Sequence, residues 1–210
     1  VSEVELLAIS KFVSLDVVEQ AYQLGICKFG ESYVQEALPK ISAFAGRPRA
    51  VEFELVGRLQ QNKVRRAVGN FSLLHAIDRP ELVHSIAKVA RERGICQRIL
   101  LQVNISRELS KGGVLSEHID ELLELALLED SLDVVGFMSY GSSLEIEGEH
   151  SNENNSRREF ASMRELAIAL RVKFARPFPV LSMGTSDDFE LAIEEGATQI
   201  RVGSALFGER

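Results

Sequence analysis

Cysteine is scarce in this chain. Cys27 and Cys96 are its only two cysteines in 210 residues, they lie far apart, and neither belongs to a CxxC pair. Neither a disulfide framework nor a cysteine-based zinc site is therefore indicated. Two isolated thiols are typical of a reducing compartment, so we expect a cytoplasmic protein.

Long apolar runs and concentrated positive charge are also missing. No apolar segment approaches the roughly 20 residues that a membrane-spanning helix needs, and no signal peptide opens the chain. The formal net charge is -7, and charges of both signs are scattered without the basic stripe that nucleic acid requires. These absences predict a soluble protein with neither a membrane nor a nucleic-acid partner.

The chain does contain a regular alternation of short apolar runs and amphipathic segments. Eight strands are predicted at 6–9, 26–30, 51–56, 71–77, 98–105, 132–138, 180–182 and 198–202. The seven helices between them are predicted at 15–24, 33–44, 58–68, 78–94, 116–128, 157–173 and 187–195, while 142–156 lacks periodicity and predicts a mobile loop.

Regular βα units favour a parallel sheet, and eight strands are the number that closes a barrel. An open doubly wound sheet is the alternative, but no glycine-rich dinucleotide motif follows the first strand. We therefore predict an α/β fold, a (β/α)8 TIM-type barrel that forms a single domain over residues 1–210.

Lys11 lies two residues after the end of the first predicted strand. In parallel barrels the carboxyl ends of the strands carry the chemistry, and an amine held against an apolar wall loses proton affinity and becomes a nucleophile. Lys11 is thus the first candidate for the Schiff-base lysine. Lys63 and Lys111 are the next candidates. The alternative is an ordinary solvated loop lysine.

The loops after the seventh and eighth predicted strands have the composition of a phosphate site. Such sites use backbone amides, small hydroxyls and glycines. The candidate residues are Ser182, Thr185, Ser186, Gly203 and Ser204. The alternative is that Thr185 or Ser186 only caps the next helix. Asp187 and Asp188 would repel a phosphate, so we expect them to face away.

Arg201 and His75 are two further polar residues on predicted strands. Arg201 lies two residues before Gly203, so both face the same side of the last strand. A buried guanidinium needs an acceptor, and from the residues alone a salt bridge to an inward carboxylate such as Glu54 is favoured.

We expect His75 to be a hydrogen-bonded core residue, because no second histidine has metal-site spacing. No metal site is therefore predicted.

Six segments of the chain form a set of motifs in a fixed order. They are LLAISK (6–11), FGESYVQEAL (29–38), VGRLQQNK (56–63), QVNIS with SKGG (102–106 and 110–113), LSMGTSDD (181–188) and RVGSALFGER (201–210). Together they span the chain nearly from end to end, and in this order they resemble the pyridoxal-phosphate homeostasis proteins.

The resemblance implies one barrel domain like the amino-terminal domain of alanine racemase, with pyridoxal 5'-phosphate (PLP) as cofactor. By this likeness Lys11 would hold the cofactor as a Schiff base, and Arg201 would hydrogen-bond the pyridine nitrogen. The phosphate would lie among the five candidates Ser182, Thr185, Ser186, Gly203 and Ser204. An arginine keeps its own proton, so it would leave the ring nitrogen unprotonated and hold back carbanion chemistry.

This chain departs from the family pattern in three ways. Ser32 stands where the family usually has asparagine, and Glu54 stands where it usually has histidine. The third departure is that family members begin with a helix before the first strand, whereas this sequence starts at Val1, almost directly on that strand. If the natural chain has that helix, an apolar seam along the first and last strands should be exposed.

Two functions follow from the resemblance. The favoured one is a non-catalytic carrier and regulator of the intracellular vitamin B6 pool, acting as a monomer; the sequence does not indicate which apo-enzymes receive the cofactor. The alternative is a PLP-dependent amino-acid racemase or a related PLP enzyme. Racemisation in alanine racemase needs a second base from a second domain, and this sequence ends at Arg210, just after the last strand. A third reading, a phosphate-binding barrel without a Schiff base, requires Lys11 to be a solvated loop lysine.

Overall fold

Eight parallel strands close on themselves in the computed structural model, which describes residues 3–108, 111–141 and 151–209. The strands are β1 (Glu5–Ile9), β2 (Lys28–Glu31), β3 (Glu52–Leu55), β4 (Leu73–Ile77), β5 (Gln97–Asn104), β7 (Leu132–Met138), β8 (Val180–Ser182) and β9 (Gln199–Val202). Each pairs with the next in this order, and β9 pairs with β1. The predicted barrel is therefore confirmed, and the open sheet is excluded.

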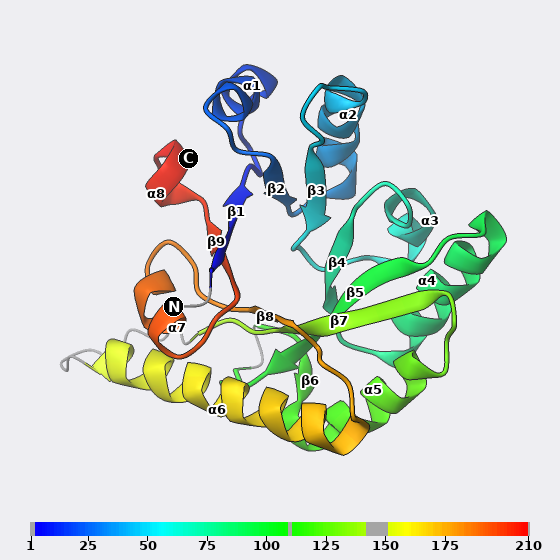
Figure 1. Cartoon of the computed structure of the whole chain (residues 1–210), viewed down its shortest axis with the longest axis vertical. Helices are drawn as coiled ribbons and strands as arrows, with labels where there is room; N and C mark the ends of the chain where they lie inside the picture. Colours follow the sequence, from blue (N-terminus) through cyan, green and yellow to red (C-terminus); the bar gives the residue numbers. More distant parts are fainter. Residues whose placement is uncertain (1–2, 109–110, 142–150, 210) are drawn as a thin grey trace.

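Helices follow the strands and lie on the outside of the barrel (Figure 1). They are α1 (Leu15–Gln23), α2 (Val34–Phe44), α3 (Val64–Ala67), α4 (Pro80–Arg93), α5 (Ile119–Leu127), α6 (Ser151–Phe174), α7 (Phe189–Glu194) and α8 (Ser204–Phe207). Three shorter elements complete the described chain: the 3-10 turns η1 (Gln61–Lys63) and η2 (Ser116–His118), and β6 (Val114–Leu115), a two-residue strand beside β5.

Successive side chains of β1 point to opposite faces of the sheet and pack in two different apolar clusters. Ala8 belongs to the large core between sheet and helices, whereas Leu7 and Ile9 form a separate apolar cluster with Val56. Gly30 on β2 leaves room for this cluster, because a Cβ there would lie 2.5 Å from Ile9 Cδ1. The strand that precedes Lys11 is thus fixed by packing on both faces.

Several predicted helix boundaries are wrong. Residues 58–60 are not helical, because Leu59 is buried in the core and the chain is still extended at Gln60. Asp78 does not cap α4: the N-cap residue is Arg79, whose Nη1 donates to Asp78 Oδ1 at 2.6 Å. These segments are set by tertiary contacts that a local pattern does not contain.

The predicted loop at 142–156 is also wrong in its last part. Residues 142–150 lie outside the described residues, but 151–156 belong to α6. Their serine and asparagine content predicts a loop, yet they continue a helix that Phe160 and Met163 anchor in the core.

The outer surface at the β1–β9 pair carries an exposed apolar side chain on β1. Leu6 on β1 is 39% exposed, whereas its register partner Ile200 on β9 is only 8% exposed. The exposed apolar surface at this strand pair is therefore confined to the β1 side. Among the described residues, no helix is both long enough and apolar enough to cross a membrane.

Candidate functional site

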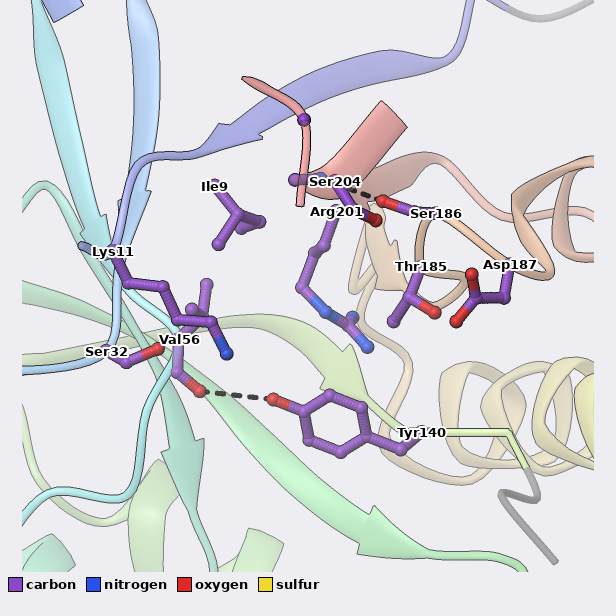
Figure 2. Close-up of a pocket in the computed structure, with 12 residues that line it drawn as sticks. Ile9, Lys11, Ser32, Val56, Tyr140, Thr185, Ser186, Asp187, Arg201 and Ser204 are labelled. Atoms are coloured by element: carbon purple, nitrogen blue, oxygen red, sulfur yellow. Dashed lines mark hydrogen bonds between the residues drawn. The ribbon is translucent and has the colours of Figure 1, made fainter. Parts of the chain in front are cut away.

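A cavity of about 330 Å³ opens at the carboxyl ends of the barrel strands. Six of the seven predicted site residues line it: Lys11, Thr185, Ser186, Arg201, Gly203 and Ser204. The other lining residues are Ile9, Ser32, Val56, Tyr140, Asp187 and Gly208. Residues that are far apart in the sequence thus meet where a parallel barrel gathers its strand ends (Figure 2).

Lys11 enters the cavity from the turn after β1. Figure 2 shows its side chain extending toward the space between Val56 and Tyr140. Ile9 and Val56 are buried and supply an apolar wall beside it, while Lys11 itself remains exposed at the cavity. Its amine is therefore accessible to a ligand and lies against a partly apolar surface.

Arg201 is the most buried cation of the cavity. It is 3% exposed, and its guanidinium donates from Nη1 to Ser182 Oγ at 2.9 Å and from Nη2 to the Ser139 carbonyl at 2.8 Å. Both acceptors are neutral, and burial lowers the pKa of Arg201. The guanidinium thus retains N–H groups and a positive charge for an acceptor inside the cavity.

Ser182 does not line the cavity with the other candidates. Its side chain is fully buried and its hydroxyl accepts the bond from Arg201. The structure therefore places Ser182 beneath Arg201, where it fixes the orientation of the guanidinium.

The loop after β8 and the start of α8 converge on one hydroxyl. Ser186 Oγ accepts hydrogen bonds from the backbone N–H of Gly203 at 3.0 Å and of Ala205 at 3.4 Å. Two amides from the β9 end and one hydroxyl from the β8 end therefore lie within a few ångströms of each other. The two amides donate to Ser186 Oγ in this structure, and the Ser186 hydroxyl keeps its own proton, which it can donate to an oxyanion in the cavity.

The neighbouring Thr185 has a local structural role. Its backbone N–H and its hydroxyl both donate to Asp188 Oδ1, at 2.6 and 3.0 Å. Asp188 thus holds the turn that leads into α7. The prediction that both acidic residues face away is wrong for Asp187, which lines the cavity, because the chain turns at 186–188 before α7 begins.

A buried polar cluster occupies the barrel interior away from the cavity lining. His75 Nε2 lies 2.6 Å from Glu54 Oε2, and Gln199 Nε2 donates to the same oxygen at 3.0 Å. This confirms His75 as a hydrogen-bonded core residue. The predicted salt bridge between Glu54 and Arg201 is wrong: each side chain bonds to other partners.

The two titratable groups of this cluster have a defined charge state. Burial alone would raise the pKa of Glu54, but the bonds from His75 and Gln199 outweigh it and lower that pKa. Burial dominates at His75 and lowers its pKa. A neutral imidazole therefore donates its Nε2 proton to an ionised carboxylate at neutral pH.

Tyr140 is a cavity residue that the sequence reasoning missed. Its ring lies against the Arg201 guanidinium, and its hydroxyl donates to the Val56 carbonyl at 3.5 Å. The available signal was its position two residues after β7, the same strand-end position that singled out Lys11.

The barrel and the strand-end cavity define a class for this chain. The family model described as alanine racemase, N-terminal domain, matches residues 2–210. The pyridoxal phosphate homeostasis protein of Aquifex aeolicus (strain VF5) is 40% identical over 206 residues, covering 98% of this chain and 87% of that protein. The chain therefore belongs to the pyridoxal phosphate homeostasis protein family.

Solved structures agree with this assignment. PipY of Synechococcus elongatus PCC7942, solved without PLP, matches with a TM-score of 0.88 and 32% identity, over 98% of this chain and 93% of that one. The structure of PipY with PLP bound gives a TM-score of 0.85 and 31% identity, over 98% and 92% of the two chains.

Proposed function

We propose that this chain binds PLP in the strand-end cavity, through a Schiff base at Lys11, and acts as a non-catalytic carrier of vitamin B6. The observation that carries the proposal is that one cavity is lined by an accessible amine, a buried guanidinium and a hydroxyl with converging amides. These are the groups that an aldehyde, a pyridine nitrogen and a phosphate require. The PLP-bound structure of the relative PipY supports the choice of ligand.

Each residue has a separate task in this proposal. Lys11 supplies the nitrogen that adds to the aldehyde carbon; the C=N bond forms and the aldehyde oxygen leaves as water. Addition of water reverses the reaction and frees the aldehyde, which a carrier needs. Arg201, held by Ser182, faces the pyridine nitrogen. The phosphate group would be bound by Ser186, Gly203 and Ser204, and Thr185, whose own donors are held by Asp188, lines the same part of the cavity.

Arg201 also affects the chemistry that bound PLP would support. PLP supplies an electron sink for carbanion chemistry when its ring nitrogen is protonated. A guanidinium keeps its proton in proteins and stays charged at neutral pH. The ring nitrogen facing Arg201 would thus stay unprotonated, which weakens that sink. The name of the curated relatives, pyridoxal phosphate homeostasis protein, agrees with regulation of a PLP pool.

A spectroscopic titration separates binding from turnover. Purified protein is titrated with PLP and followed by absorbance, and the loaded protein is then incubated with L-alanine while the D enantiomer is measured. The proposal predicts a saturable Schiff-base band and no racemisation. A band together with racemisation would favour the alternative, an amino-acid racemase. If no band forms, binding by Schiff base is wrong.

A further inference from the structure

Lys11 is flanked by two residues whose polar atoms are held by charged side chains. Ser10 Oγ donates to Glu31 Oε1 at 2.6 Å, and the Ser10 carbonyl accepts from Lys40 Nζ at 2.7 Å. On the other side of Lys11, the backbone N–H of Phe12 donates to Glu36 Oε1 at 2.5 Å. The turn that carries Lys11 is thus anchored immediately before and immediately after it.

Lys40 joins these anchors into one unit. Besides Ser10, its ammonium donates to Glu31 Oε1 at 2.8 Å and to Glu36 Oε1 at 2.9 Å. An ammonium has three protons, so these three acceptors use all of them. Lys40 is only 6% exposed and Glu31 is fully buried. We refer to Glu31, Glu36 and Lys40 as the Lys40 cluster.

The backbone held by this cluster is strained. Phe12 has φ of 61°, in the left-handed region that residues with a side chain rarely adopt. Such a conformation costs on the order of 1–3 kcal/mol and persists only where surrounding contacts enforce it. The charged hydrogen bond from Glu36 to the Phe12 amide is such a contact.

The cluster spans three elements that meet only in the fold. Glu31 ends β2, Glu36 and Lys40 lie one helical turn apart on α2, and the turn they hold follows β1. Burying charged groups is weak evidence for stability, because apolar packing of similar volume often stabilises as well. What apolar packing cannot supply is directed hydrogen bonds to Ser10 and Phe12.

We propose that Glu36 and Lys40, supported by Glu31, are positioning residues that orient Lys11 toward the cavity. The inference rests on the proposed function, because the consequence of orientation is faster capture of the PLP aldehyde by the Lys11 amine. Misplacing a reacting group by about 1 Å costs on the order of a hundredfold in rate. Glu31, Glu36 and Lys40 are not among the residues that line the cavity, so the effect proposed for them is exerted through the turn that carries Lys11.

The test compares capture rates and backbone exchange in a matched set of variants. PLP is added to each variant, the adduct is trapped with borohydride at successive times, and the Lys11 peptide is quantified. Glu36→Ala removes the acceptor for Phe12, whereas Glu36→Gln keeps a carbonyl oxygen in that place. We expect capture by Glu36→Ala to be roughly tenfold to a hundredfold slower, and Glu36→Gln to be close to the wild type.

Lys40→Met tests the centre of the cluster. Its control is Lys28→Met, which removes a partly buried lysine that is ion-paired to Glu5 and Glu52 and lies outside the turn. Lys40→Met should slow capture and Lys28→Met should not. If Lys40→Met does not fold, the Glu36 pair decides the matter, because the Glu36 side chain is one-quarter exposed and its loss leaves no buried charge unpaired.

Hydrogen exchange in the cofactor-free protein provides a readout that does not depend on PLP. The amide of Phe12 should exchange faster in Glu36→Ala than in Glu36→Gln or the wild type. Faster exchange with an unchanged capture rate would overturn the positioning role. Unchanged exchange would overturn the anchoring itself, even if the wild type formed no adduct. Absence of an adduct at Lys11 in the wild type would instead contradict the proposed function.

Discussion

The guanidinium carbon of Arg201 lies 4.7 Å from the centroid of the Tyr140 ring. Figure 2 shows the two side chains meeting at the cavity, one from β9 and the other from the segment after β7. A cation over an aromatic face is attracted by the ring, most strongly where water is excluded. Tyr140 therefore holds the charged end of Arg201 in place from the cavity side.

Shortening Tyr140 should weaken PLP binding. Tyr140→Leu removes the ring that holds the Arg201 guanidinium, a contact worth about 1–2 kcal/mol, so the guanidinium is less well oriented for PLP and the dissociation constant should rise. Tyr140→Phe keeps the ring and loses only the hydroxyl, so its dissociation constant should stay near that of the wild type. Absorbance titration with PLP measures both. Equal weakening of the two variants would show that the hydroxyl, and not the ring, is the important group.

Ser182 should matter for stability as much as for binding. Ser182→Ala removes an acceptor from a buried guanidinium, and leaving such a donor unsatisfied costs about 1–3 kcal/mol in the free energy of unfolding. Ser42→Ala on the exposed side of α2 is the matched control, expected to change that free energy by less than about 0.5 kcal/mol. Urea unfolding measures both variants. A Ser182→Ala protein as stable as the control would contradict the support of Arg201 by Ser182.

The Glu54 and His75 pair predicts a loss of stability in acid. The folded state lowers the pKa of Glu54, so its contribution is present above the ordinary glutamate pKa and is lost as the pH falls through the folded value. The folded state also lowers the pKa of His75, so below about pH 6.5 the unfolded chain binds a proton that the folded chain does not. Both effects reduce the free energy of unfolding as the pH falls.

Urea unfolding at about pH 7.5 and about pH 5.5 measures the histidine part of this effect. His75→Gln should lower stability at the higher pH and show a smaller change between the two. His84→Gln is the control, because the His84 side chain is largely exposed, whereas that of His75 is fully buried. His84 also has a glutamate neighbour, since its Nδ1 lies 3.3 Å from Glu129 Oε1. A wild-type protein equally stable at both pH values would contradict the buried neutral imidazole.

The barrel was predictable because its strands are short apolar runs that stand out from the helices. Elements as short as β6 and α8 contain too few residues for a periodic pattern. The start of α6 was misjudged because the polar residues at its amino-terminal end have low helix propensity, while the core contacts that sustain the helix come later in the sequence.

The site was predictable only where position along a strand is enough to place a residue. Strand ends located Lys11, Ser186 and Gly203, and a family resemblance gave Arg201 its candidate role. The alternation of side chains along a strand predicts which face of the sheet a residue occupies, but not which side chain it contacts across the barrel. The predicted partner of Glu54 was therefore Arg201, whereas its partners in the structure are His75 and Gln199. The contact between Lys40 and Ser10 depends on how α2 packs, which no local pattern contains.

The identity of the lysine that binds PLP is the most direct test of the account. Protein loaded with PLP is reduced with borohydride, digested and mapped by mass spectrometry, for the wild type and for Lys11→Ala. Lys11 is exposed, so its loss should change the free energy of unfolding by less than about 0.5 kcal/mol. The account predicts one modified peptide, containing Lys11, and none in the variant. An adduct that persists in Lys11→Ala, for example on Lys63 or Lys111, would contradict it.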